Sequence, residues 1–277
     1  MISIGEDVFV TENLNGASNA GVVIGKKGII VVDSTFFPSK AIRLMDFISS
    51  ISSKIILYVV NTHYHLDHTL GNCAIEAPVI SSEMTKDYLE RIDFEKFRSS
   101  LEPIIQKELK DARIVFPSIT FNRKMTVDLG NKKIEILRVG GHTPDSSIIK
   151  VWPNGICFCG DLLFSGYHAE ITSESDIDSW IKILGKLKNE NLKWFVPGHG
   201  SIGSVKEVDE MMIYLEKFKS LSFMIKSNKI DDVIEKFGDD PVFAQRGFPL
   251  LFEDSLIEYL RRDDVGKNAG PYKARRR

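Results

Sequence analysis

The segment Thr62–His68, with the sequence Thr-His-Tyr-His-Leu-Asp-His, places three imidazoles and one carboxylate within six positions. Imidazole nitrogen is a preferred ligand of zinc, so these residue types at this density indicate a metal site. If the segment is extended, His63, His65 and Asp67 share one face, because side chains alternate along a strand. His68 then turns to the other face, and the segment can serve two neighbouring ions.

The chain has six histidines, and two of those outside this segment follow predicted strands. His142 lies in a Gly-Gly-His-Thr-Pro sequence, and His199 lies in a Pro-Gly-His-Gly sequence. Asp161 also follows a predicted strand, in a Cys-Gly-Asp sequence. Glycine neighbours let the backbone approach a site closely. We expect all of these side chains to open onto one edge of the sheets, where open α/β folds commonly place their sites.

The elements that must position these residues are short β-branched runs and amphipathic segments. Strands are predicted over residues 8–10, 21–24, 29–32, 55–60, 114–116, 119–127, 133–139, 146–151, 156–159 and 192–196. Helices are predicted over 39–51, over 83–110 with a kink at Pro103, and over 176–190. Beyond residue 203 only helices are predicted, over 205–227, 230–237 and 253–262, followed by a frayed polar tail at 263–277.

Composition excludes several classes of protein. The 277 residues are 43% apolar and 27% charged, which is enough to bury a sizeable core. A net charge of -2 argues against a dedicated nucleic-acid binder. Three cysteines form no disulfide framework, residues 1–7 lack the pattern of a signal peptide, and apolar runs such as 55–60 are too short to cross a membrane. We therefore expect a cytoplasmic protein with neither nucleic acid nor membrane as its partner.

The order His-x-His-x-Asp-His, then His142, Asp161 and His199, resembles that of the metallo-β-lactamase superfamily. The resemblance extends from about residue 20 to residue 203 and fills all five motif positions. It implies an α/β fold, an αββα sandwich of two mixed β-sheets flanked by helices, with a metal pair at one edge. Residues 1–203 would form this domain, and residues 204–277 would form a C-terminal helical extension that packs on the sandwich.

The resemblance also implies a role for each candidate ligand. His63, His65 and His142 would bind one ion, Asp67, His68 and His199 a second, and Asp161 would bridge both. A hydroxide held between the ions would be the nucleophile, and Asp67 would be the catalytic residue that orients it and shuttles a proton. The expected cofactors are two divalent ions, most simply zinc, with iron and manganese as alternatives because nitrogen and oxygen ligands accept all three.

Five neighbouring residues have weaker functional interpretations. Thr62, Asp33 and Thr143 border the ligand loops and could orient ligand histidines, although capping of strand ends explains them equally well. Cys157 and Cys159 share one face of a strand and could suggest a metal pair. Packing as small apolar residues is the simpler explanation for both cysteines.

The superfamily contains hydrolases, so the resemblance implies a hydrolase of a small-molecule ester, thioester, lactone or related carbonyl substrate. The sequence is most like generic members of the branch related to glyoxalase II and lactonases. Phe164, Tyr167 and His168 follow Asp161 and are candidates for the substrate pocket, although His168 suits a surface position equally well. The alternative is a non-catalytic metal-binding or regulatory module, in which residues 204–277 mediate dimerisation or bind a partner.

Overall fold

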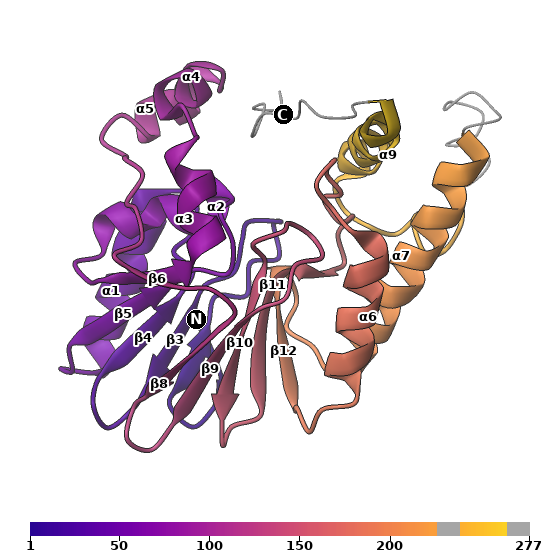
Figure 1. Ribbon diagram of the computed structural model, residues 1–277. Coiled ribbons are helices and arrows are strands. Elements are labelled where there is room, and N and C mark those ends of the chain that lie inside the picture. Colours follow the sequence, from indigo (N-terminus) through magenta and orange to yellow (C-terminus); the bar gives the residue numbers. More distant parts are fainter. Residues whose placement is uncertain (226–238, 265–277) are drawn as a thin grey trace.

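Two β-sheets pack face to face in the computed structural model, which describes residues 1–225 and 239–264 (Figure 1). The first sheet has its strands in chain order: β1 (Ile2–Gly5), β2 (Val8–Val10), β3 (Gly21–Ile24), β4 (Ile29–Val32), β5 (Ile56–Val60), β6 (Val79–Ser82) and β7 (Ile119–Phe121). The second has the order β12 (Trp194–Gly200), β11 (Ile156–Ser165), β10 (Ser147–Trp152), β9 (Lys133–Arg138) and β8 (Lys124–Asp128).

Both sheets are mixed. Strands β1 to β4 are antiparallel neighbours, whereas β4 to β7 run parallel. In the second sheet β8 to β11 are antiparallel, and β11 pairs with β12 in parallel. Apolar side chains from the two inner faces, such as Val32 and Val60 of the first sheet and Ile149 and Val196 of the second, form the core between them. The predicted αββα sandwich is confirmed.

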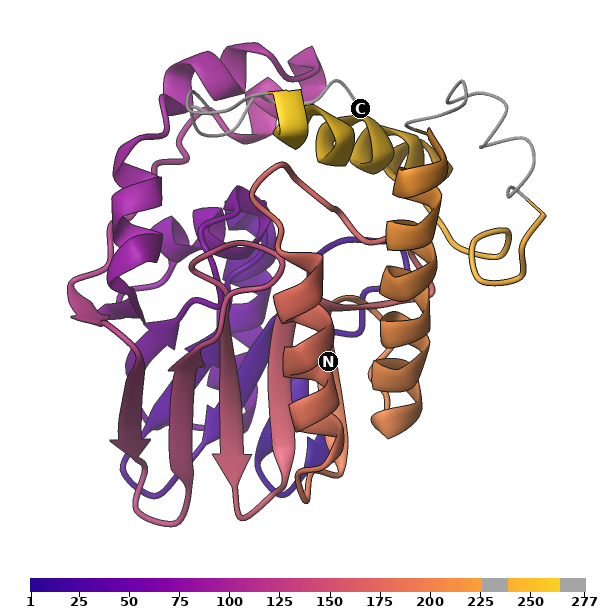
Figure 2. The same cartoon turned by 45° about the vertical axis from the view of Figure 1, so that its right-hand side comes forward.

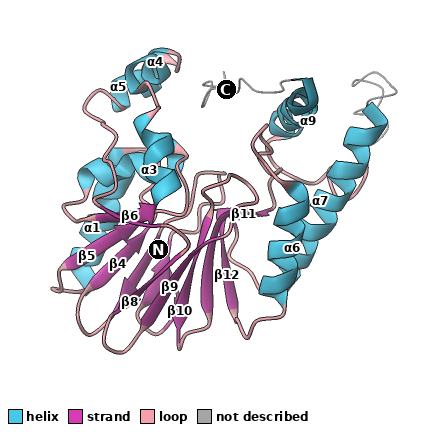
Figure 3. Ribbon diagram, in the orientation of Figure 1, coloured by secondary structure: helices cyan, strands magenta, loops and turns pink. Residues whose placement is uncertain are grey.

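Helices cover the outer face of each sheet, as Figure 3 shows. On the first sheet they are α1 (Pro38–Ile51), α2 (Leu66–Thr69), the short 3-10 helix η1 (Leu70–Ala74) and α3 (Glu83–Glu90). Helix α1 begins with proline at its first turn, where the absent N–H costs nothing, and buries Ala41, Leu44 and Ile48. On the second sheet α6 (Ile177–Lys188) buries Trp180, whose Nε1 donates to the Leu162 carbonyl at 2.9 Å.

The described C-terminal residues share a core with the second sheet. Helix α7 (Val205–Ile225) packs against α6, and α9 (Pro249–Asp264) lies across one end of the sandwich (Figure 2). Phe218, Phe243 and Phe252 belong to the same apolar cluster as Phe195 of β12. The predicted helix over 230–237 and most of the predicted tail lie outside the described residues. Within the described ranges, none of the helices has the length and apolar character needed to cross a membrane.

Three predictions between residues 83 and 127 are wrong in detail. Residues 112–117 form no strand, although 114–116 are apolar. Residues 119–127 form two strands in different sheets, because the chain crosses between the sheets at 122–123. The segment 83–110 forms three short helices, α3, α4 (Phe94–Ser99) and α5 (Pro103–Glu108). Asp93 caps α4, and Pro103 begins α5 instead of kinking a longer helix.

Candidate metal centre

The histidine-rich segment follows the C-terminal end of β5 and then enters a short helix. Strand β5 ends at Val60, and α2 begins at Leu66, so Asp67 and His68 lie on a helical turn. The prediction of an extended segment with alternating faces is therefore wrong. His63 precedes the turn and His65 is its N-cap residue, and the turn brings these two histidines, Asp67 and His68 into two adjacent groups of side chains.

Buried hydrogen bonds hold this turn in place. The main-chain carbonyl of His68 accepts from the N–H of Ser34 at 2.9 Å and from Asn61 Nδ2 at 3.2 Å. Asp33, at the end of β4, accepts from the Thr62 N–H at 2.8 Å. The turn is thus anchored to residues that follow two neighbouring parallel strands, β4 and β5.

The other three candidate ligands come from the second sheet. His142 lies in the loop after β9, whereas Asp161 lies within β11 and His199 within β12. The expectation that these two residues follow their strands is wrong, because both strands continue past the predicted ends. Position 198 of β12 requires glycine, because a Cβ atom at this position would lie 1.9 Å from Asp161 Oδ1 of β11.

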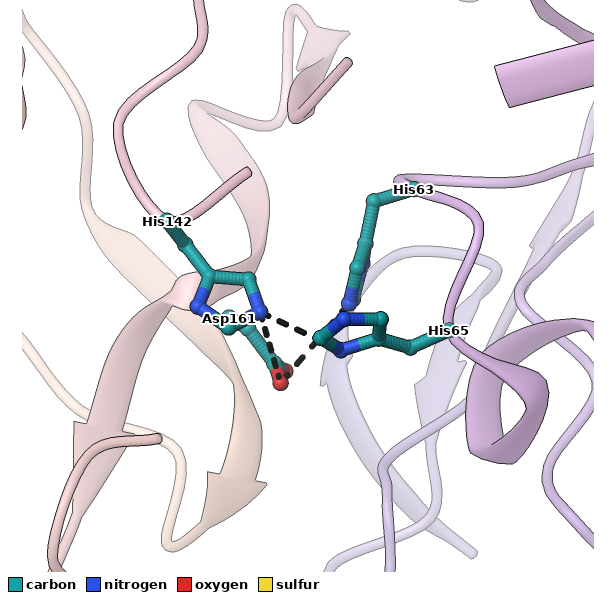
Figure 4. Close-up of side chains that lie close together, drawn as sticks. All are labelled: His63, His65, His142 and Asp161. Carbon is teal, nitrogen blue, oxygen red and sulfur yellow. Dashed lines mark hydrogen bonds and ion pairs between the residues drawn. The ribbon is translucent and has the colours of Figure 1, made fainter. Parts of the chain in front are cut away.

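The structure brings all seven candidate ligands into two adjacent groups. The nitrogen and oxygen atoms of each group lie within 4.8 Å of one another, and the groups are His63, His65, His142 and Asp161, and Asp67, His68 and His199. Figure 4 shows His63 and His65 on one side of the first group and His142 and Asp161 on the other.

Asp161 lies between the two groups and turns one oxygen toward each. Its Oδ2 atom is 3.8 Å from His63 Nε2 and 3.7 Å from His142 Nε2. Its Oδ1 atom is 3.0 Å from His68 Nε2 and 3.5 Å from His199 Nε2. A carboxylate in this position is suited to contact an ion in either group.

In the first group, hydrogen-bond acceptors at Nδ1 of two imidazoles determine which ring nitrogen carries the proton. The Nδ1 atom of His142 donates to the Glu170 carbonyl at 3.0 Å, which leaves the Nε2 lone pair free to bind a metal. The Nδ1 atom of His63 is 3.0 Å from the Thr62 hydroxyl, which itself donates to Asp33. Thr62 therefore accepts the proton of His63, and His63 Nε2 also presents a lone pair.

The second group has the same arrangement. His68 Nδ1 lies 2.9 Å from Asp33 Oδ2, and His199 Nδ1 donates to the Gly16 carbonyl at 2.8 Å. Both imidazoles therefore direct Nε2 toward Asp161 and Asp67. An imidazole held by its second nitrogen in this way is the usual form of a histidine metal ligand.

The histidines of the first group are neutral at pH 7. Burial lowers the pKa of His65 and of His142 to about 4. Burial and the neighbouring His68 also hold the pKa of His63 well below its ordinary value. A neutral imidazole is the form that binds a metal ion, so the first group can accept an ion without losing protons from these rings.

The histidines of the second group, in contrast, have raised pKa values and favour the protonated form. Burial alone would lower the pKa of His199, but the carboxylates of Asp161 and Asp67 outweigh it and raise that pKa to about 10. Asp161, Asp67 and Asp33 likewise raise the pKa of His68 above its ordinary value against the effect of burial. An ion binding here would replace protons that now compensate the two carboxylates.

An unpaired buried atom at the centre fits a metal. The Nε2 atom of His63 is buried and makes no hydrogen bond, although an oxygen of Asp161 lies 3.8 Å away. An unpaired buried polar atom costs roughly 1–3 kcal/mol. Converging nitrogen lone pairs and carboxylates match the ligands of zinc and related divalent ions, so the residues fit two such ions.

The comparison with known families agrees with this geometry. The family model described as the metallo-beta-lactamase superfamily matches residues 14–199, which include all seven candidate ligands. The chain belongs to the metallo-β-lactamase superfamily. It is a hydrolase of that superfamily.

Relatives within the superfamily are distant. A probable metallo-hydrolase of Methanocaldococcus jannaschii is 27% identical over 202 residues, covering 69% of this chain and 92% of that protein. A type 2 metallo-β-lactamase of Bacillus sp. (strain 170) is 24% identical over 67% of this chain and 68% of its own length. A hydroxyacylglutathione hydrolase of Idiomarina loihiensis is 28% identical, over 51% of this chain and 44% of that protein.

Solved structures show the same fold at lower identity. A metallo-β-lactamase from Pontibacter korlensis has a TM-score of 0.61 and 22% identity, over 78% of this chain and 97% of that one. A sec-alkylsulfatase from Pseudomonas sp. has a TM-score of 0.71 and 13% identity, over 89% of this chain and 47% of that one. These structures establish the fold and not the substrate.

Among the residues with weaker interpretations, Thr62 and Asp33 contact ligand histidines, as described above. Thr143 instead donates its N–H to Ser146 Oγ at 3.0 Å, so it stabilises its own loop. The Sγ atoms of Cys157 and Cys159 are 3.8 Å apart and both residues are buried in the apolar core against the helices.

Sequence reasoning missed two residues that accept hydrogen bonds from candidate ligand histidines, Gly16 and Glu170. Both act through main-chain carbonyls, which every residue possesses, so no sequence signal identifies them. The side chain of Glu170 also lies at the centre, with Oε2 3.6 Å from His65 Nδ1. That nitrogen is 3.3 Å from His142 Nε2, so the carboxylate lies beside the first group.

The three predicted pocket residues have different surroundings. The Phe164 ring stacks on His199 with centroids 5.2 Å apart and planes 5° apart, next to the metal centre. The Tyr167 ring lies 5.0 Å from the ring of Phe248. His168 is not on the surface: it is buried beside Phe243 and Phe252. Packing against these two rings explains the burial of His168.

Proposed function

We propose that this superfamily member is a dinuclear metal-dependent hydrolase of an ester, thioester, lactone or related carbonyl substrate. The observation that supports two ions is the position of Asp161, whose two oxygens face separate groups of histidines. A site for a single ion would not need a second set of converging nitrogens on the far side of this carboxylate.

Each group would hold one ion. His63, His65 and His142 would bind the first ion, Asp67, His68 and His199 the second, and Asp161 both. The ions would supply a water of lowered pKa and polarise the substrate carbonyl. Zinc is the simplest choice for this ligand set, with iron and manganese as alternatives.

Asp67 is suited to orient the attacking water and to accept its proton. Its Oδ2 atom is 3.2 Å from His199 Nε2 and 3.5 Å from His68 Nε2, and a third of its side chain is exposed. Partial burial would raise the pKa of Asp67, but His68 and His199 outweigh this effect and hold it below its usual range. The carboxylate is therefore ionised and accessible, so it can hold the attacking water as a hydrogen-bond acceptor.

The surroundings suit an uncharged reacting group. The Phe164 ring, stacked on His199, provides an apolar wall at the second group. The Glu170 carboxylate beside His65 adds negative charge at the first group. An apolar wall and an additional carboxylate both suit a neutral carbonyl group, since the carboxylate lowers the net positive charge that two bound ions would give the centre.

The alternative, a non-catalytic module that dimerises through its C-terminal region, receives no support from the described residues there. Phe218, Phe243 and Phe252 are buried within the chain itself, which leaves them unavailable to a partner. A homodimer and a cytoplasmic location stay predictions, as does a domain boundary at residue 203.

The test is hydrolysis by protein loaded with two equivalents of zinc, iron(II) or manganese, assayed on a panel of thioesters, lactones and aryl esters. We expect turnover of at least one class and its loss in Asp161→Asn. Asp128→Asn is the matched control, because Asp128 is exposed and pairs with Lys27. Inertness across the panel with two ions bound would favour the non-catalytic module.

A further inference from the structure

The loop between β2 and β3 reaches the metal centre through a main-chain carbonyl. The Gly16 oxygen accepts from His199 Nδ1 at 2.8 Å, and this hydrogen bond determines which nitrogen of His199 faces the second group. Asn19, at the end of this loop, anchors it to β12 by donating its N–H to the Gly198 carbonyl at 2.7 Å. Gly16 lies three residues earlier, so its position also depends on the contacts that it makes itself.

Phe248, just before α9, supplies one of these contacts. Its ring occupies the space beside Gly16, where a Cβ atom would lie 2.0 Å from Phe248 Cζ. Gly16 has a φ of +79°, which also favours glycine. Phe248 itself has a φ of 61°, a conformation that is strained for a bulky residue and persists only where the surroundings impose it.

A second contact comes from Tyr167, which pairs with Gly247, the residue before Phe248. The Tyr167 hydroxyl donates to the Leu14 carbonyl in the same loop. Tyr167 and Gly247 form a β-bridge, beside which the Gly247 N–H donates to the Gly166 carbonyl at 2.9 Å. Tyr167 and Phe248, whose rings are in contact, therefore reach the loop from two segments that are paired with each other.

We propose that Phe248 is a positioning residue for the second metal ion. It presses Gly16 toward the metal centre, keeps the Gly16 carbonyl against His199 Nδ1 and so directs the Nε2 lone pair of His199 to the ion. The C-terminal region is thereby a structural part of the metal centre. This inference rests on the proposed dinuclear site.

The experiment measures stepwise metal affinity in the full chain. Zinc is titrated into metal-free protein against a chelating dye, and cobalt(II) absorption reports the environment of each site. We expect Phe248→Ala to weaken the second ion by about tenfold or more with the first unchanged, as removal of a residue that orients a ligand commonly does. Leu250→Ala is the control, because Leu250 is 75% exposed on the same segment.

Two further variants separate positioning from general destabilisation. Phe248→Leu retains most of the volume and should restore most of the second-site affinity. Gly16→Ala should weaken the second ion less in the Phe248→Ala background than in the wild type, because the clash with the ring is gone. Unchanged second-site affinity in Phe248→Ala, or equal losses at both sites, would overturn the inference. A wild type that takes up one ion would overturn the dinuclear proposal and this inference together.

Discussion

Asp33 offers a sharp test of how the second ion is held. Its Oδ2 atom is 2.9 Å from His68 Nδ1 and 2.8 Å from the Thr62 hydroxyl, and its Oδ1 atom accepts from the Thr62 N–H. In Asp33→Asn the amide must face at least one of these donors. If it faces His68, that ring must take the other tautomer and present N–H instead of a lone pair to the ion.

The expected loss follows from the bonds involved. A buried hydrogen bond to a charged group contributes roughly 1.5–3 kcal/mol, and each 1.4 kcal/mol is a tenfold change in affinity. We therefore expect Asp33→Asn to weaken the second ion by roughly 10- to 100-fold, in agreement with the usual effect of residues that orient metal ligands.

Isothermal titration of metal-free protein with zinc measures this loss, with Asp128→Asn as the control for removal of one carboxylate at the surface. Circular dichroism checks that both variants keep their secondary structure. A folded Asp33→Asn protein that binds two ions as tightly as the wild type would refute the reasoning, because His68 would then need no acceptor behind it.

Three more outcomes are expected. Asp67→Ala should cut turnover by roughly a hundredfold or more, measured at saturating substrate, and unchanged turnover would contradict the assignment of Asp67. Burial raises the pKa of Asp145 to about 6, so the folded chain binds this proton more tightly than the unfolded chain and stability falls as pH rises from about 4 to about 6. In urea unfolding of metal-free protein, Asp145→Asn should lose this part of the pH dependence, and parallel curves would show that Asp145 does not titrate there. Chelation of the ions should lower the melting temperature reversibly, because the ions bind the folded chain, and an identical melt would argue against bound metal.

The candidate ligands can be selected from the sequence because their chemistry resides in side chains. Imidazoles and carboxylates concentrated at strand ends are visible without a structure, and the resemblance supplied their grouping. Gly16 and Glu170 could not be found, because only tertiary contacts decide which carbonyl stands behind a histidine. The helical turn at Leu66–Thr69 was missed because the histidine spacing fits an extended segment equally well.

The fold was predictable where local pattern and tertiary pairing agree. The runs that became β3 and β4 were placed correctly, since short β-branched segments between turns leave little choice. The segment 114–116 has the same composition but no neighbouring strand to pair with, and Phe116 is half exposed. The crossing at 122–123 contains neither glycine nor proline, so nothing in the sequence marks the passage from one sheet to the other.

The candidate ligands are divided between the two sheets: one set follows β5, and the other comes from β9, β11 and β12. Before the two sheets pack together, each group of candidate ligands is incomplete. If the centre holds ions as proposed, metal capture would come late in folding, after the sheets have packed. For the same reason, ions already captured would have to be released before the layers could part, which would make unfolding slower in their presence.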